Sequence, residues 1–94
     1  MYDERVLDFD WDAENIQHLG RHRISPAEAM EILSSEPIIL DHEIVDGEDR
    51  WRALGRTNGL RILVIAFPVR NHKFRPITGW KATKSLIEEH FCQE

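Results

Sequence analysis

The segment from Arg50 to Phe67 places the strongest constraint on the fold, because its sequence predicts two strands joined by a tight turn. Residues 50–56 alternate with a period of two, which is typical of a strand with one basic face. Asn58-Gly59 is a strong signal for a hairpin turn. Residues 61–67 are nearly all apolar and β-rich, which suits a central strand buried on both faces. The chain is therefore expected to fold around a sheet.

Two helices are predicted before this hairpin. Asp12 can cap a first helix, which Gly20 either ends or weakens. Ser25-Pro26-Ala27-Glu28 is a stronger start signal, because serine caps, proline suits the first helical position and the glutamate completes a capping box. Pro37 closes this second helix.

The other predicted elements are a strand at 6–9, a strand at 38–40, a turn at 46–49, a loop at 68–72, a strand at 73–78 and a helix at 81–91. In the strand at 73–78, Pro76 implies an edge position or a bulge. Gly79 is expected to break that strand. The prediction is one α+β domain over residues 1–94, with a mostly antiparallel sheet, two N-terminal helices and one C-terminal helix.

Charge divides the chain into two halves. Residues 1–49 hold 14 acidic and 3 basic side chains, whereas residues 50–94 hold 9 basic and 3 acidic ones. The net charge of −5 taken alone argues against a nucleic-acid-binding protein, because phosphate binding usually shows as a basic domain. The division itself points to an anionic partner. We expect the acidic and basic sets to form opposite surfaces, which leaves the basic face available.

The basic residues of the second half fall at regular positions. Arg50, Arg52 and Arg56 share one face of a strand. Lys81 and Lys84 are expected to begin the last helix, where lysines oppose the helix dipole. Because neighbouring strands of a meander lie side by side, several of these cations can converge on one patch that binds phosphate or acid. The alternative is a strand face that is merely solvated.

The remaining residues give no sign of a metal site or a cofactor. His18 and His22 are four residues apart and could chelate a metal on one helix, but no glutamate stands between them as in a metalloprotease helix. His22 or His72 could instead act as a general acid or base. The single Cys92 excludes a disulfide framework within the chain and a cysteine-based zinc site.

A cytoplasmic protein without a membrane partner is expected. No signal peptide is visible, because residues 1–20 are acidic and interrupted. The longest apolar run, residues 62–67, is far below the ~20 residues that span a bilayer.

Three groups of residues resemble, in order and spacing, the BrnT family of toxins. They are Phe9-Asp10-Trp11-Asp12 with Asn15, Arg21-His22 and Ile24-Ser25; Gly47-Glu48-Asp49-Arg50 with Leu54-Gly55-Arg56; and Arg75-Pro76-Ile77-Thr78 with Ala82-Thr83. The resemblance covers about residues 7–90. It implies a RelE-like fold and a metal-independent endoribonuclease that needs no cofactor. Its partners would be RNA and a ribbon-helix-helix antitoxin that covers the active face.

Metal-free RNA cleavage needs a base for the 2′-hydroxyl, an acid for the leaving oxygen and cations for the phosphorane. Arginine suits the last task, because it holds phosphate bidentately and stays charged. From the resemblance and the basic stretch together, the predicted catalytic residues are His22, Arg50, Arg56, Arg75 and Thr78. The predicted RNA-binding residues are Arg21, Arg52, Trp80, Lys81 and Lys84.

The sequence departs from the BrnT pattern at three points. Arg23 replaces the glycine that usually follows the histidine, and Trp80 replaces the arginine that ends the last-strand motif. The net charge is also acidic, whereas toxins of this class are usually basic. Two alternatives therefore stay open. One is a catalytically inactive module that binds RNA or an acidic partner. The other is an oligomer, such as a homodimer, in which the acidic half of one copy meets the basic half of another.

Overall fold

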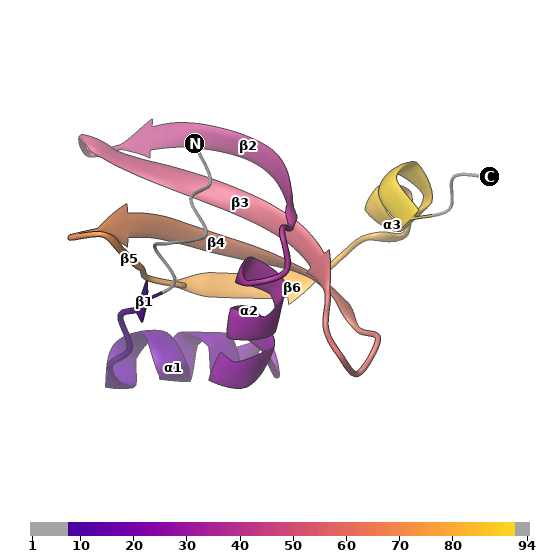
Figure 1. Ribbon diagram of the computed structural model, residues 1–94, viewed down its shortest axis with the longest axis horizontal. Helices are drawn as coiled ribbons and strands as arrows, with labels where there is room; N and C mark the ends of the chain where they lie inside the picture. The colour runs from indigo at the N-terminus through magenta and orange to yellow at the C-terminus, as the bar shows by residue number, and fades with distance from the viewer. Residues whose placement is uncertain (1–7, 92–94) are drawn as a thin grey trace.

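The computed structural model describes residues 8–91 as six strands and three helices (Figure 1). The elements in chain order are β1 (Asp8–Phe9), α1 (Ala13–Arg21), α2 (Pro26–Leu33), β2 (Ile38–Val45), β3 (Glu48–Arg56), β4 (Ile62–Arg70), β5 (Lys73–Phe74), β6 (Thr78–Lys81) and α3 (Lys84–Phe91). The sheet has the order β1-β5-β4-β3-β2, and β6 pairs with β4. Every pairing except β1 with β5 is antiparallel. The predicted α+β class is confirmed.

Both N-terminal helices begin at the predicted caps. The Asp12 side chain accepts from the backbone N–H of Asn15 at 3.1 Å, and the Asn15 side chain accepts from the backbone of Asp12 at 2.9 Å. Ser25 and Glu28 form the same reciprocal pair at the start of α2. These contacts satisfy amide groups that have no partner within the helix. Gly20 lies inside α1 and does not end it.

Two-residue turns fix the outer hairpins of the sheet. Asp46-Gly47 joins β2 to β3 with φ values of 52° and 78°, the left-handed geometry that matches the twist of a hairpin. Asn71-His72 joins β4 to β5 with φ values of 52° and 64°. The predicted loop at 68–72 is therefore too long, because Pro68, Val69 and Arg70 continue β4. The Pro68 carbonyl is still used, since it accepts from the Arg75 amide at 3.0 Å.

The predicted strand at 73–78 is divided into β5 and β6, and Gly79 does not end it. Gly79 lies within β6, where an added Cβ would approach the Val64 carbonyl oxygen to 2.8 Å and Ile65 Cδ1 to 2.9 Å. Glycine is therefore what allows β6 to pack closely beside β4. Lys81 ends β6 instead of opening the last helix, and α3 begins only at Lys84.

Helices α1 and α2 cover one face of the sheet and lie below the strands in Figure 1. The buried apolar core on that face comprises Leu19, Ile24, Ala29, Ile32, Leu33, Ala53, Leu63, Ile65, Phe67 and Phe74. Alternate residues of β3, β4 and β6 point the other way, toward a surface that we call the outer face. Helix α3 extends past the end of the sheet, and none of its residues is fully buried. Within residues 8–91, no helix has the length and apolarity needed to span a membrane.

Candidate functional site

A cavity of about 250 Å³ opens between α1 and the strands at the β5–β6 connection. We call it the arginine cavity, and its lining residues are Glu14, Asn15, His18, Arg50, Arg70, Arg75, Ile77 and Thr78. Three guanidinium groups thus share one hollow with an imidazole and a hydroxyl. Three of the predicted catalytic residues, Arg50, Arg75 and Thr78, lie together there.

The strand register explains why distant residues meet in this cavity. Arg50 of β3 lies opposite Pro68 of β4, and the Arg75 amide donates to the Pro68 carbonyl. These three residues therefore form one row across the sheet. Thr78 of β6 lies opposite Ala66, in the next row on the outer face. Helix α1 closes the cavity from the side, because Glu14 and His18 are four residues apart on one helical face.

Arg75 is the most deeply buried cation in the cavity, with 8% of its surface exposed. Its Nη2 atom donates to Asp12 Oδ2 at 2.9 Å, and its guanidinium also lies 3.5 Å from Asp10 Oδ2. The hydrogen bond from the Asn15 amide, with that from Arg75, lowers the pKa of Asp12. Arg75 therefore anchors the start of α1 as well as lining the cavity.

Arg50 and Arg70 share a single carboxylate. Glu48 accepts two hydrogen bonds from Arg70, one from Nη2 at 3.0 Å and one from Nε. The hydrogen bond from Arg70 lowers the pKa of Glu48, and the same bond raises the pKa of Arg70. Arg50 Nε lies 3.6 Å from Glu48 Oε1, too far for a hydrogen bond. This Nε is buried and has no hydrogen-bond partner, although it lies within ion-pair distance of Glu48.

Other predicted residues lie elsewhere. Arg21 and His22 are exposed at the C-terminal end of α1, and neither lines the arginine cavity. Arg56 lies at the far end of β3, six residues or about 20 Å along the strand from Arg50. Lys81 lines a separate cavity of about 290 Å³ beside Arg61. Lys84 is the first residue of α3 and is exposed.

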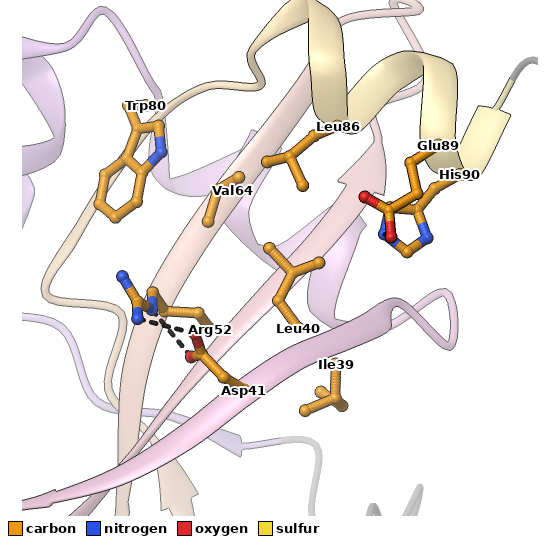
Figure 2. A pocket seen from close by; sticks show the side chains of 9 residues that line it. All are labelled: Ile39, Leu40, Asp41, Arg52, Val64, Trp80, Leu86, Glu89 and His90. Atoms are coloured by element: carbon orange, nitrogen blue, oxygen red, sulfur yellow. Dashed lines mark hydrogen bonds and ion pairs between the residues drawn. The ribbon is translucent and has the colours of Figure 1, made fainter.

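Arg52 and Trp80 line a second and larger hollow of about 480 Å³, shown in Figure 2. We call it the tryptophan pocket, and its lining residues are Ile39, Leu40, Asp41, Arg52, Val64, Trp80, Leu86, Glu89 and His90. It lies between β2, the outer face and α3. The predicted residues are therefore distributed between the arginine cavity, this pocket and the exposed ends of the elements.

Sequence reasoning missed His18, Arg70 and Glu14 as cavity residues. The spacing of His18 and His22 suggests metal chelation, whereas the signal for the cavity is that Glu14 and His18 are one helical turn apart. Arg70 belongs to the predicted loop at 68–72, whereas in the structure it ends β4. Within residues 8–91, no three side chains of the metal-ligating types gather into a cluster.

The expectation of opposite acidic and basic surfaces is wrong, because the two halves neutralise each other inside one chain. Four ion pairs cross between the halves, namely Asp41 with Arg52, Glu28 with Arg61, Glu48 with Arg70 and Asp12 with Arg75. Each pair joins a carboxylate before residue 49 to an arginine after residue 50. The division of charge along the sequence therefore reflects ion pairs between the two halves of the chain more than it reflects a free basic face.

The fold and the cavity define a small α+β domain with a hollow that gathers arginines. The family model for BrnT, the ribonuclease toxin of type II toxin–antitoxin systems, matches residues 11–85. The chain therefore belongs to the BrnT family, as its motifs suggested. A comparison with curated proteins finds no match. Membership of the family implies an RNA substrate and an antitoxin partner.

Proposed function

We propose that this protein is a metal-independent endoribonuclease whose reacting phosphate occupies the arginine cavity. The observation that carries the proposal is the gathering of Arg50, Arg70 and Arg75 in one cavity, with Thr78 and His18 beside them. Guanidinium groups that share one hollow favour a ligand that is anionic and accepts hydrogen bonds. A phosphate oxygen supplies both an acceptor and a negative charge.

The chemistry follows from the types of side chain present. In cleavage, the 2′-hydroxyl of RNA loses its proton and the 2′-oxygen forms a bond to the adjacent phosphorus. The bond from phosphorus to the 5′-oxygen then breaks, and the departing 5′-oxygen takes up a proton. The phosphorane between these two events carries extra negative charge on its oxygens. Arg50 and Arg70 would stabilise that charge, and Arg75 would hold one wall of the cavity in place. Thr78 offers a hydroxyl that can donate to a phosphate oxygen. An imidazole would move a proton to or from the reacting oxygens, and His18 is the histidine whose position favours this role.

The exposed cations outside the cavity fit a role in holding the RNA backbone. Among residues 8–91, no carboxylate pairs with Arg21, Arg56, Lys81 or Lys84, so their charge is available to phosphate. His22 lies next to Arg21 and would join the same track. We propose these residues as RNA-binding groups, which differs for Arg56 and His22 from the catalytic role expected from the sequence. Their contribution would fall steeply with salt.

The test is RNA cleavage by purified protein in the presence of a chelator. Arg50→Ala is expected to lower the cleavage rate by 100-fold or more, which is the usual loss when one donor to a developing oxyanion is removed. Lys73→Ala is the matched control, since Lys73 is an exposed cation of β5 that lines none of the three hollows described above. Thermal melts of both variants exclude unfolding. Equal cleavage by the two variants would remove the arginine cavity as the reaction site.

A second candidate is a module of the same fold that binds RNA or an acidic partner without cleaving. The observation that favours it is the pairing of Arg70 and Arg75 with carboxylates, which reduces the positive charge offered to a phosphate. RNA binding that weakens with salt, with no cleavage by highly purified protein, would select this candidate.

The same proposal includes the type of antitoxin, the type of fold, the site of action and the oligomeric state. The antitoxin would be a ribbon-helix-helix protein, the fold RelE-like and the site of action the cytoplasm. Co-expression with a neighbouring ribbon-helix-helix reading frame should yield a stable complex and suppress growth arrest. A homodimer would need a basis other than the docking of an acidic half on a basic half, because those charges pair within one chain. Sedimentation at two salt concentrations measures whether a homodimer forms and whether salt weakens it.

A further inference from the structure

We propose that the tryptophan pocket is a nucleobase subsite that prefers guanine, and that it holds a base of the same RNA strand that is cleaved in the arginine cavity. The inference rests on the proposed function, because that function identifies the bound molecule as the RNA strand that is cleaved. The volume of about 480 Å³ lies within the range of pockets that hold small organic ligands. The pocket also combines an aromatic ring, an apolar floor and four charged or polar side chains, Asp41, Arg52, Glu89 and His90. Of these, Arg52 and Asp41 are fixed by their mutual hydrogen bonds.

The position of the pocket relative to the arginine cavity supports a shared strand. Thr78 lines the cavity and Trp80 lines the pocket, and the two lie two residues apart on the same side of β6. Across β4, Thr78 lies opposite Ala66, and Ala66 lies opposite Arg52. One row of the sheet therefore connects the cavity to the pocket. A base next to the reacting phosphate could reach the pocket along the outer face.

The apolar surface of the pocket suits a flat ring. Val64, which is 1% exposed, forms the floor opposite Trp80 in the β4–β6 ladder. In Figure 2, Leu40 and Leu86 lie near each other on the side of Val64 away from Trp80, and Trp80 lies toward the same end as the Arg52 guanidinium. A half-buried indole beside such a floor offers a stacking surface for any base. Stacking supplies affinity here, but it does not distinguish one base from another.

Arg52 supplies the discrimination. Its Nε and Nη2 atoms donate to the two Asp41 oxygens at 2.8 Å and 2.7 Å, as the dashed lines in Figure 2 mark. This bidentate contact fixes the plane of the guanidinium and leaves Nη1 free to donate. Among the four bases, only guanine presents two adjacent acceptors, O6 and N7, on one edge. Adenine and cytosine carry an amino group on that edge. An amino group donates hydrogen bonds, and the Arg52 guanidinium has no atom that accepts one.

Asp41 is a positioning residue in this arrangement, since it orients Arg52 and need not touch the base. The β-bulge of β2 at Ile39–Asp41 places Leu40 and Asp41 where both line the pocket. Helix α3 adds Leu86, Glu89 and His90 as the opposite wall, and all its residues remain half-buried or exposed. The pocket therefore has a fixed wall of strands and a wall with few buried contacts, through which a base could enter.

The direct test uses nucleosides, which lack the phosphate that the arginine cavity would bind. Guanosine, adenosine, cytidine and uridine are titrated against the protein while the indole N–H resonance of Trp80, assigned with Trp80→Phe, is followed by NMR. Guanosine should shift this resonance and bind about 10-fold more tightly than the others, the size of one good base contact. Arg52→Ala should abolish the preference, and the charge-matched Lys73→Ala should keep it. Equal binding of all four nucleosides, or no shift at Trp80, would overturn the proposal.

A cleavage assay separates failure of the subsite from failure of the proposed function. Oligonucleotides that differ only in carrying guanine or adenine beside the cleavage site are compared for wild type and Arg52→Ala. A guanine preference of about 10-fold that is lost in Arg52→Ala supports the subsite. Cleavage without any base preference overturns the subsite and leaves the ribonuclease standing. Selective guanosine binding with no cleavage overturns the ribonuclease and leaves the subsite standing.

Discussion

Arg75 and Asp12 lie 63 residues apart in the sequence, and their side chains meet at 2.9 Å. Asp12 also caps α1, because it accepts from the Asn15 amide at 3.1 Å. One carboxylate therefore starts a helix and holds the most buried arginine of the cavity. The contact fixes α1, which carries His18, against the β5–β6 connection, which leads into Thr78 at the start of β6.

Substitution of Asp12 should separate its two roles. Asp12→Asn keeps a capping side chain but removes the charge that faces Arg75, whereas Asp12→Ala removes both. The melting temperature is expected to fall in both variants, by several degrees, and further in Asp12→Ala. Thermal denaturation followed by circular dichroism at pH 7 measures the order. Equal melting temperatures for the two variants would show that the cap contributes nothing.

Stability should decline in acid through two carboxylates whose pKa values are lowered in the folded state. The Asn15 amide and Arg75 lower the pKa of Asp12, and Arg70 lowers that of Glu48. A lowered folded-state pKa gives stability that is present above the unfolded-state pKa and lost as the pH falls through the folded-state pKa. The melting temperature should therefore be steady near neutral pH and fall below about pH 4.

Glu48→Gln provides the control for this pH dependence. Glutamine has no proton to gain in this range, so the variant should lose less stability between pH 5 and pH 2 than the wild type, as estimated by linkage. The measurement is a series of melts across that range at constant ionic strength. A variant with the same pH slope as the wild type would assign the acid sensitivity to other groups.

Two glycines should respond in opposite directions to alanine. In Gly79→Ala, the new Cβ would meet the backbone oxygen of Val64, which cannot move aside without disturbing the β4–β6 ladder. The expected loss is about 1–3 kcal/mol of unfolding free energy. In Gly20→Ala, nothing lies within 4 Å of the new Cβ inside α1, and a gain of about 0.5–1 kcal/mol is expected. Urea denaturation measures both, and a neutral Gly79→Ala would contradict the close packing of β6.

Features set by neighbouring residues were predictable from the sequence. The caps at Asp12 and Ser25 and the turn at Asp46-Gly47 depend on contacts within three residues, so the sequence pattern contains all the partners. The extent of β4 was not predictable in this way. Pro68 reads as a loop residue because it lacks an amide donor, but its carbonyl is used by Arg75 from a later segment.

The candidate site was predictable only in part, for the same reason. Strand parity placed Arg50 and Arg52 on one face, but the carboxylates that pair with the cations come from distant positions. Arg61 meets Glu28 across 33 residues, and Arg70 meets Glu48 across 22. Such pairings depend on the register between strands and on how helices dock, which charge counts along a chain do not contain. The cations that remain available are consequently fewer than the composition suggests.

The choice between His18 and His22 gives the sharpest test of the cavity. Both histidines are exposed residues of the α1 region four positions apart, but only His18 lines the arginine cavity with Arg50 and Thr78. His18→Gln should lower RNA cleavage by about 100-fold or more, the usual contribution of a general acid or base, and remove one limb of the pH–rate profile. His22→Gln should keep that limb and lose only part of the RNA affinity. Cleavage by both variants is measured from pH 5 to pH 9, with melts to check folding. If His22→Gln loses the limb and His18→Gln keeps it, the reacting phosphate lies at the end of α1 and not in the arginine cavity.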